Sequence, residues 1–496
     1  MSAEAVCFAS AEECFSEVVS FLQGDEAAAL DHGELEERLE ARSREVFRRL
    51  YQGHLDLRAA REERLEEVKD QEGVARPYVE EGHARSLAVV FGGVKASRFA
   101  YRAKGKPNLH PADAWLNLPE ERYSHGLGRL AAIEAARGSY DSATEALERA
   151  TGQRVPKRQL EQLVRRAAKD VEEFYASQEA EPTGPGDVVV LSCDGKGIVM
   201  RPDSLCEPTR RAAEASSAKP RARLSKGQKS GRKRMATIGA VYEVEPRPRS
   251  ADDIFPTEPS EEPAPAPDAK NKWLTASVAG TAAQVVSDVF DEAERRDPAH
   301  ERTWVALVDG NNHQIERIGA EAGERGVEVT VVVDFVHVME YLWGSARSFF
   351  AEGDPAAETW VRDRAVAVLE GKARDVAAGI RRRASTEGLR ASARQGADEC
   401  ATYLSNKAGY LDYPKALSSG WPIATGVIEG AVRHVCKDRM DVTGARWSVD
   451  GAEAVLKLRA LRSNGEFDAY WRWHRSRERQ RVHGARYHEN VIPAAA

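Results

Sequence analysis

The chain has 496 residues, of which 42% are hydrophobic, so it is long enough for roughly two to four domains with more than one buried core. The formal net charge of −7 would exclude a nucleic-acid ligand only if the charge were evenly spread, and the lysines and arginines are gathered in local blocks. The first residues are acidic, and no run approaches the roughly 20 apolar residues that cross a bilayer, so neither secretion nor a membrane partner is expected. The cysteines are scattered without a CxxC pair, which is typical of a reducing cytoplasm and indicates neither a disulfide framework nor a zinc site.

The N-terminal region, residues 1–125, is predicted to be mainly helical with one short hairpin. Residues 30–75 are rich in Glu, Arg, Leu and Ala with apolar residues near the helical period, which predicts one or two charged amphipathic helices. Residues 89–102 contain Gly92 and Gly93 and have aromatic residues near their end, a pattern typical of a hairpin.

Residues 126–180 predict a helix-turn-helix-like DNA-binding segment. A helical pattern over residues 142–150 is broken at Gly152, and a basic second helix is expected over residues 157–174. The second helix of such a motif enters the major groove of DNA. Its basic side chains are therefore candidate DNA contacts: Lys157, Arg158, Arg165 and Arg166. A plain helical hairpin is the alternative.

The most basic part of the chain is residues 210–234, in which Glu214 is the only acid. Such a block gains order from phosphates, so it is a second candidate DNA-binding segment, and a solvated loop is the alternative. Its last residues are specific candidates: Arg232, Lys233 and Arg234. Residues 249–270 are acidic and rich in proline, which predicts an irregular, disordered excursion.

Short apolar runs alternate with helical segments from residue 187 onward, which predicts a mixed α/β sheet. Strands are expected over residues 188–193, 235–244, 304–308 and 327–333, and helices over 281–295 and 314–323. Residues 338–420 contain only Ala- and Arg-rich helical sequence, which predicts an all-helical insertion. The sheet domain therefore comprises 187–337 and 421–466, and 467–496 are expected to form a basic C-terminal tail. Arginines of the insertion are further candidates for phosphate contacts: Arg362, Arg364, Arg374, Arg381, Arg382 and Arg383.

Three acidic residues stand where these runs meet a turn or a helix. Asp194 and Asp309 each follow an apolar run and precede a glycine, and Glu429 lies on a helix expected after Pro422. Carboxylate oxygens suit Mg²⁺ or Mn²⁺, and two such ions about 3.5–4 Å apart can clamp the attacking and leaving oxygens of a phosphoryl transfer. Each residue alone is also typical of an ordinary turn or a solvated helix, so the interpretation depends on their order and surroundings.

The order of these segments resembles the ribonuclease H-like catalytic domain of DDE transposases. Residues 187–470 are similar to bacterial insertion-sequence DDE transposases of the ISKra group through short motifs: LSCDGKG at 191–197, VDG at 308–310, DFVH at 334–337, GVIEG at 426–430, KDRM at 437–440 and TGARW at 443–447. The last of these blocks is the most specific. Relatives often carry Cys pairs after a hairpin like that at residues 89–102, and this chain has none there, so a zinc module is not expected.

The resemblance implies that Asp194, Asp309 and Glu429 are the catalytic triad and hold two ions, Mg²⁺ or Mn²⁺. It also implies that Asp334 and His337 form an accessory signature known in transposases with helical insertions. At this spacing the two side chains can orient each other, or His337 can contact DNA.

Further candidate DNA contacts follow Glu429. On a regular helix Arg433 and Lys437 share its face, four and eight residues later, so two cations that can hold a phosphodiester stand beside a metal ligand. An ordinary intrahelical salt bridge is the alternative. Trp447 can stack on an unpaired base, although buried packing is the commoner fate of tryptophan, and Arg446 beside it is the last candidate DNA contact.

These features predict a transposase that binds terminal inverted repeats through residues before 180 and then cleaves and joins DNA with two divalent ions. Its partners would be double-stranded DNA at the transposon ends and at the target, and holding two ends predicts a homodimer or a higher homo-oligomer. The expected location is the bacterial cytoplasm, associated with the nucleoid. A stand-alone ribonuclease H-like nuclease or resolvase shares the acids but needs neither the end-binding region nor the insertion. A transposase-derived DNA-binding protein that no longer cuts would readily lose one of the acids.

Overall fold

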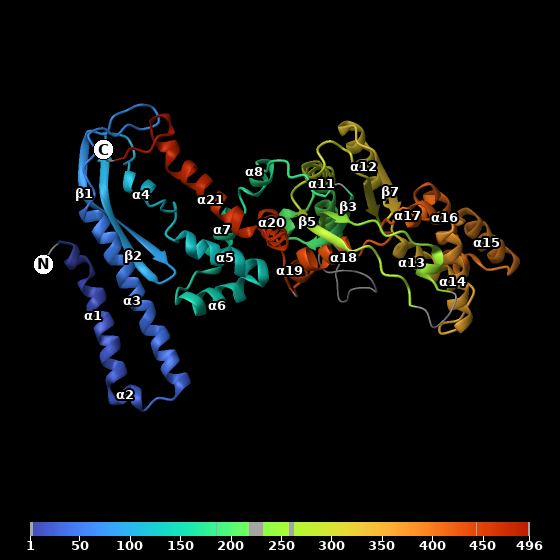
Figure 1. The fold of residues 1–496 in the computed structure, drawn as a ribbon, viewed down its shortest axis with the longest axis horizontal. Coiled ribbons are helices and arrows are strands. Elements are labelled where there is room, and N and C mark those ends of the chain that lie inside the picture. Colours follow the sequence, from blue (N-terminus) through green and yellow to red (C-terminus); the bar gives the residue numbers. More distant parts are fainter. Residues whose placement is uncertain (1–2, 185, 218–231, 257–261, 443, 495–496) are drawn as a thin grey trace. The chain divides into compact units, whose positions relative to one another are not determined.

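The structure, a computed structural model, describes residues 3–184, 186–217, 232–256, 262–442 and 444–494 (Figure 1). The chain divides into two compact units: unit 1 comprises Met1–Ser177 with Glu466–Ala496, and unit 2 comprises Gln178–Gly465. Within the described ranges, none of the helices combines the length and the apolar character that a membrane crossing requires.

Unit 1 begins with a long helical hairpin. α1 (Ala3–Gln23) packs against α3 (His32–Ala60), and the short α2 (Asp25–Ala28) connects them. α3 begins with a capping box, in which Asp31 accepts from the Glu34 amide at 2.9 Å and Glu34 accepts from the Asp31 amide at 3.1 Å. The charged helix predicted within residues 30–75 is present as α3 but ends at Ala60, and α1 lies in the region predicted to be mainly helical, without bounds of its own.

A two-stranded antiparallel sheet follows. β1 (Tyr78–Val89) pairs with β2 (Gly92–Arg102). The predicted hairpin, residues 89–102, covers the turn and β2 but not β1. Most side chains of β1 before Leu87 are exposed or half-buried, so this strand lacks the apolar alternation by which strands are recognised.

Five helices follow the hairpin in unit 1: α4 (Pro111–Trp115), α5 (His125–Arg137), α6 (Tyr140–Thr151), α7 (Lys157–Ala167) and α8 (Val171–Ala176). α5, α6 and α7 pack on one another, and Leu147, Leu160 and Val164 are buried there. α6 ends at Gly152, whose φ of 66° is left-handed and favours glycine. Two helices separated by this turn agree with the prediction, except that the second ends at Ala167 and α8 is separate.

The C-terminal segment belongs to unit 1 and is not a tail, which corrects the prediction for residues 467–496. It contains α21 (Phe467–Val482) and two 3₁₀ turns, η4 (Gly484–Arg486) and η5 (His488–Asn490). The Tyr470 hydroxyl donates to the Ala167 carbonyl at 2.6 Å. The many arginines of α21 gave the segment the composition of a basic tail. It nevertheless has a buried face, made of residues at helical spacing: Phe467, Tyr470, Trp471 and His474.

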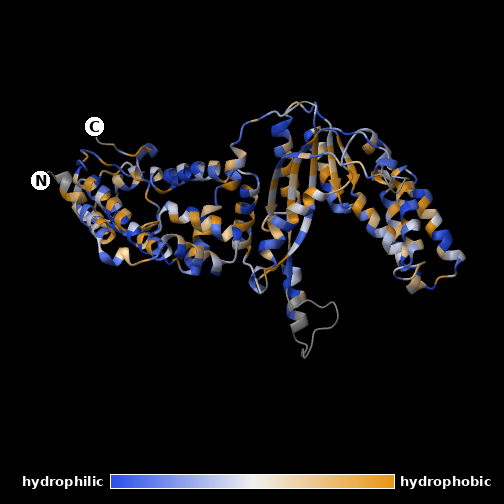
Figure 2. Cartoon of the chain, turned by 60° about the horizontal axis from the view of Figure 1, so that its bottom comes forward, coloured by the Kyte–Doolittle hydropathy of each residue, from blue (hydrophilic) through white to orange (hydrophobic). Residues whose placement is uncertain are grey.

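Unit 2 contains a five-stranded mixed sheet in the order β5-β4-β3-β6-β7. Its strands are β3 (Val188–Val199), β4 (Lys233–Val244), β5 (Ala269–Ser277), β6 (Trp304–Val308) and β7 (Val329–Val333). β4 is antiparallel to both β3 and β5, whereas β3, β6 and β7 are parallel. The mixed α/β prediction is confirmed, and Figure 2 shows hydrophobic residues concentrated along these strands.

Two details of the sheet differ from the prediction. β3 does not end at Asp194 but continues to Val199, because β4 pairs with it over its whole length. β5 was not predicted and begins in the segment expected to be irregular, because its first residues are charged or exposed and only its second half is apolar. The short α10 (Ala251–Ile254) also lies in that segment.

Helices pack on the sheet of unit 2. α11 (Ala282–Arg296) contacts β3, β4 and β5, α12 (Asn312–Arg325) contacts β6 and β7, and α20 (Val449–Ser463) contacts β5. Between β3 and β4 lie η1 (Pro202–Ser204) and α9 (Glu207–Ser217). The helices predicted over residues 281–295 and 314–323 are thus present as α11 and α12.

The segment after β7 is helical, as predicted. Its elements are α13 (Phe335–Ala346), α14 (Pro355–Leu369), α15 (Ala373–Thr386), α16 (Ala391–Lys407), η2 (Ala408–Tyr410) and α17 (Tyr413–Ser418). We call residues 338–420 the helical insertion. α13 and α16 approach closely, since a Cβ on Gly396 would collide with the Gly344 carbonyl. Two of its arginines stack on aromatic rings, Arg364 on Trp360 at 3.9 Å and Arg383 on Phe349 at 4.5 Å, so these two stabilise the insertion itself.

Candidate active site

A row of aspartates crosses the parallel half of the sheet of unit 2. The pairing of β3 with β6 and of β6 with β7, continued past the last paired residues, places Asp194 beside Asp309 and Asp309 beside Asp334. The Asp334 amide donates to the Val308 carbonyl at 2.7 Å, so the β6–β7 pairing extends to this point. Side chains at paired positions of neighbouring strands lie on the same face, with the strands about 4.8 Å apart. The two aspartates singled out in the sequence therefore come together.

Glu429 reaches this row from α18 (Gly426–Ala431). Its carboxylate, that of Asp334 and the imidazole of His337 offer ligand atoms that all lie within 4.8 Å of one another. The Thr425 hydroxyl donates to Asp334 and lies 3.3 Å from Glu429 Oε1. The chain thus leaves the sheet after Asp334, forms the helical insertion, and returns with Glu429 beside its point of departure.

Asp334 is fully buried and all of its acceptor capacity is used. It accepts from the Val336 amide at 2.9 Å, from His337 Nδ1 at 3.0 Å, and from both the amide and the hydroxyl of Thr425. A carboxylate has about four lone-pair sites, and four donors occupy them here. Asp334 therefore positions His337 and Thr425, and the mutual orientation of Asp334 and His337 considered from the sequence is present.

Asp194 and Asp309 have different surroundings. Among the contacts described for these two carboxylates, each uses one oxygen: Asp194 Oδ1 accepts from the Gly195 amide at 2.5 Å, and Asp309 Oδ1 accepts from the Asn311 amide at 2.8 Å. The second oxygen of each is left for another ligand. Both side chains are half-buried at the sheet. Asp194 and Asp309 are therefore better suited to bind a metal ion than Asp334, whose acceptor sites are all occupied.

The charges of this row shift two pKa values. Burial raises the pKa of Asp194, and the negative charges of Asp309 and Glu429 raise it further, against the opposing effects of the Gly195 amide and His337. The hydrogen bond from His337 to Asp334 raises the pKa of His337 to about 9, so this imidazole is charged at neutral pH. Neighbouring carboxylates raise each other's pKa, and a divalent cation stabilises their charged forms because its positive charge offsets their repulsion. The carboxylates of Asp194, Asp309 and Glu429 are therefore oxygen donors that suit Mg²⁺ or Mn²⁺.

The helix after Glu429 is not regular. α18 passes into a π-helical turn, η3 (Val432–Lys437), and then into α19 (Asp438–Met440). A π-helical turn contains an extra residue, so the expected shared face of Glu429, Arg433 and Lys437 does not hold. Arg433 is exposed and lies 3.9 Å from Asp438, and Lys437 is exposed. That Arg433 and Lys437 contact DNA stays a prediction, which rests on their exposure and not on a helix face shared with Glu429.

Trp447 is buried and packs in unit 2. Its indole donates to the Met440 carbonyl at 3.2 Å, and its amide donates to the Val199 carbonyl at 3.1 Å. Arg439 lies over the ring at 4.6 Å. The ring is therefore not available to stack on a base in this structure, and the packing alternative accounts for it. Arg446 beside it is exposed.

The candidate cations of α7 in unit 1 differ in their surroundings. Lys157 pairs with Asp141 at 2.7 Å, and Arg165 pairs with Glu161 at 2.8 Å. Arg166 pairs with Glu121 at 2.7 Å. Arg158 is exposed, and Gln162 is exposed one turn later on the same face of α7. A contact between this face and DNA stays a prediction.

The basic block at residues 210–234 is only partly described, because residues 218–231 lie outside the described residues. Its last residues lead into β4 and are half-buried. Arg232 donates to the Ala212 carbonyl at 3.4 Å, and Arg234 donates to the Ala279 carbonyl at 3.2 Å. A role for these two and for Lys233 in DNA binding stays a prediction.

The sequence did not reveal the residues that the insertion brings to Asp309. On α16, the Tyr403 hydroxyl donates to the Asp309 carbonyl at 3.2 Å, and the Lys407 ammonium donates to the Asn312 side chain. Burial lowers the pKa of Lys407, although the charge of Asp309 opposes this shift. Tyr403 and Lys407 lie one turn apart, but no sequence pattern connects Tyr403 to a residue 94 positions earlier.

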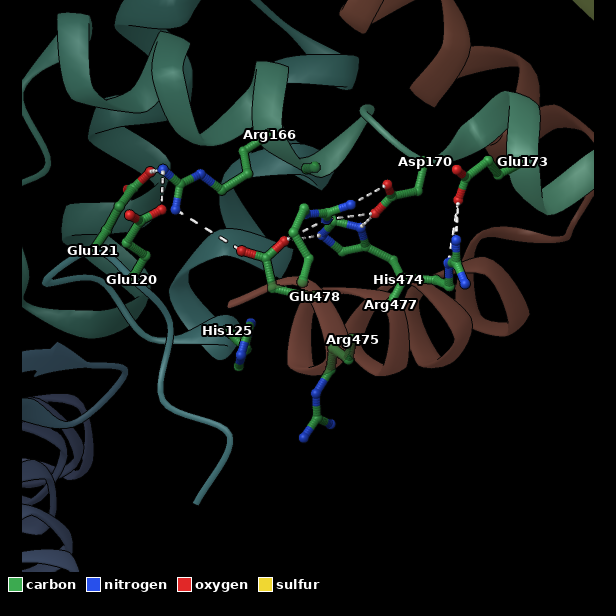
Figure 3. Close-up of polar contacts among 12 residues, drawn as sticks. Glu120, Glu121, His125, Arg166, Asp170, Glu173, His474, Arg475, Arg477 and Glu478 are labelled. Atoms are coloured by element: carbon green, nitrogen blue, oxygen red, sulfur yellow. Dashed lines mark hydrogen bonds and ion pairs between the residues drawn. The ribbon is translucent and has the colours of Figure 1, made fainter. Parts of the chain in front are cut away.

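A second group that could hold a metal ion lies in unit 1 (Figure 3). It consists of Asp170, His474 and Glu478, all buried. His474 Nδ1 lies 2.6 Å from Asp170 Oδ2, and Arg481 donates to both oxygens of Asp170 at 2.7 and 2.9 Å and to Glu478 at 2.9 Å. A guanidinium bound to both carboxylates repels a cation and uses their lone pairs. This group is therefore an ion-pair network that fastens α21 to α8, and it is the weaker metal candidate.

No model of a protein family and no curated protein matches this chain. The assignment of a function therefore rests on the residues and their geometry.

Proposed function

We propose that this protein is a DDE transposase of the insertion-sequence type, similar to the ISKra group, which binds the terminal inverted repeats of a DNA element and catalyses metal-dependent cleavage and strand transfer. The observations that support the proposal are the register of the parallel strands, which puts Asp194 beside Asp309, and the return of Glu429 to within 4.8 Å of Asp334 and His337, at the end of the strand next to Asp309. Its substrate would be double-stranded DNA in the bacterial cytoplasm, bound by a homodimer or a larger homo-oligomer.

The layout of unit 2 supports a ribonuclease H-like fold. The first acid lies on a strand that forms an antiparallel hairpin with β4, the second follows the adjacent parallel strand β6, and the third returns on a helix after an all-helical insertion. This is the layout that the sequence resemblance implies. A stand-alone nuclease needs no insertion between the second and third acids, so the insertion favours the transposase over that alternative.

In this proposal Asp194, Asp309 and Glu429 are the ligands of two Mg²⁺ or Mn²⁺ ions. When bound, such ions activate the attacking oxygen, first of water and later of a 3′-hydroxyl, and stabilise the leaving oxygen. Asp334 positions Thr425, whose hydroxyl lies 3.3 Å from Glu429 Oε1, and the charged His337 stands beside Asp334 and Glu429. Two exposed cations that follow Glu429 in the chain, Arg433 and Lys437, would be available to a phosphodiester.

The test of this function is cleavage of DNA that flanks the gene. The full-length protein is incubated with linear duplexes that carry these flanks, in Mg²⁺, in Mn²⁺, or in a chelator. Metal-dependent cuts at the ends of inverted repeats, followed by joined products, are expected. Cleavage without regard to sequence would favour the nuclease alternative, and binding of the repeats without cleavage under either metal would favour the non-cutting alternative.

The exposed face of α7 is expected to read the repeat. The double variant Arg158→Ala, Gln162→Ala should lower the affinity for repeat DNA by about tenfold or more, because contacts from arginine and glutamine to base edges each contribute roughly 1–3 kcal/mol. Affinity for unrelated DNA should change little. Fluorescence anisotropy at constant salt measures both, and Arg149→Ala, at an exposed position on α6, is the control. Equal losses on both DNAs would mean that this face contacts only phosphates.

A further inference from the structure

The turn after β6 is held from the helical insertion. Gly310, which follows Asp309, has a φ of +90°, in the left-handed region, and a Cβ there would lie 2.9 Å from the Tyr403 hydroxyl oxygen. That hydroxyl donates to the Asp309 carbonyl at 3.2 Å. The turn that aims the Asp309 side chain therefore packs directly against a residue of α16, and only glycine fits between them.

Tyr403 is itself held in place. Its ring stacks on that of Tyr341 at 4.0 Å, with an angle of 18° between the planes. Tyr341 lies on α13, one turn after His337. Gly344 and Gly396 let α13 and α16 approach closely, and Ser348 accepts from the Ala397 amide at 3.2 Å. Two aromatic rings and a tight helix pair thus fix the Tyr403 hydroxyl relative to the acids.

A second contact holds the same turn. The Lys407 ammonium donates to the side chain of Asn312, the first residue of α12. Because Tyr403 and Lys407 lie on consecutive turns of α16, one face of this helix contacts both ends of the segment 309–312. The segment also carries the Asn311 amide that donates to Asp309 Oδ1 at 2.8 Å. A movement of α16 would therefore change the direction of the Asp309 carboxylate.

We propose that Tyr403 is a positioning residue for Asp309, so that the helical insertion completes the metal site and does not serve only as a surface for DNA. The hydroxyl fixes the backbone of the Asp309 turn, and the fixed turn presents the carboxylate oxygen that is left for an ion. The metal-binding half of this inference rests on the proposed function, whereas the effect on the turn does not.

Tyr403→Phe tests the inference, because it removes the hydrogen bond and keeps the ring that stacks on Tyr341. In the full-length protein, hydrogen exchange of the amides in residues 309–313 should become faster, and the apparent affinity for Mn²⁺, measured by calorimetry, should fall about threefold to tenfold. Tyr410→Phe, the same change on another tyrosine of the insertion, should leave both unchanged.

The outcomes separate this inference from the proposed function. Unchanged exchange of residues 309–313 in Tyr403→Phe overturns the inference, whatever happens to Mn²⁺. Faster exchange with unchanged Mn²⁺ affinity also overturns it, because the turn would then not position a ligand. If the wild-type protein does not bind Mn²⁺, the proposed function fails and so does the metal-binding half, while the exchange result still decides whether Tyr403 holds the turn.

Discussion

Asp194→Asn, Asp309→Asn and Glu429→Gln are each expected to reduce DNA cleavage by more than about 100-fold, beyond the roughly 10- to 100-fold cost of losing an outer-shell partner of a metal ligand. Each change removes a charged oxygen ligand and keeps the size of the side chain. Binding to the terminal repeats should be nearly unchanged, because none of the three supplies a cation to a phosphate. Cleavage and gel-shift assays on the same preparations measure the two effects.

Asp363→Asn is the matched control for the triad variants. Asp363 is an exposed acid on α14 of the same unit, so the substitution makes the same change of charge away from the site. Near-normal cleavage with Mg²⁺ by any one of the three variants would remove that residue from the triad. A parallel loss of repeat binding would show that the variant perturbs more than the metal ligands.

Asp334→Ala is expected to lower the free energy of unfolding of unit 2 by about 2–4 kcal/mol, because it leaves hydrogen-bond donors unsatisfied, at roughly 1–3 kcal/mol, and removes a helix N-cap, at roughly 1 kcal/mol. The change leaves His337 and Thr425 without their shared acceptor and removes the N-cap of α13. Urea unfolding of the full-length protein measures it, with hydrogen exchange in β7 and α13 identifying the transition of unit 2. Asp354→Ala, at the N-cap of α14 and not buried, should cost only about 1 kcal/mol.

The cost of Asp334→Ala should depend on pH. The pKa of His337 is raised from 6.5 to about 9 by its hydrogen bond to Asp334, so the pair contributes its full stability below pH 6.5 and loses it as the pH rises toward 9. The difference between wild type and variant should therefore be larger at pH 6 than at pH 9. A difference that grows with pH would mean that the charge of His337 does not stabilise the fold.

The sequence was most informative where a strand is mostly apolar. β6 consists of buried apolar residues and precedes Asp309, β7 is apolar apart from Thr330 and precedes Asp334, and both strands were predicted close to their observed bounds. β1 and the first half of β5 carry charged or exposed residues, so neither has the periodicity of a strand, and pairing with a neighbour decides their structure. Tertiary pairing is not visible in one sequence.

In the candidate site, too, residues in a local sequence pattern could be predicted, whereas residues brought in by tertiary packing could not. Asp194, Asp309 and Glu429 could be singled out because each follows a recognisable local pattern. Tyr403 and Lys407 could not, because nothing in an Ala-rich helix tells which face meets a turn 94 residues earlier. Trp447 and the face shared by Glu429 and Arg433 were misjudged for a related reason: burial and a π-helical turn are set by packing and not by spacing.

The most direct test of the central claim is the position of Mn²⁺ in crystals of the full-length protein, located by its anomalous scattering. The proposal predicts two peaks about 3.5–4 Å apart, both within coordinating distance of Asp194, Asp309 and Glu429. A single peak at the network of Asp170, His474 and Glu478, or the lack of any peak beside Asp194 and Asp309 in Mn²⁺-saturated crystals, would contradict it.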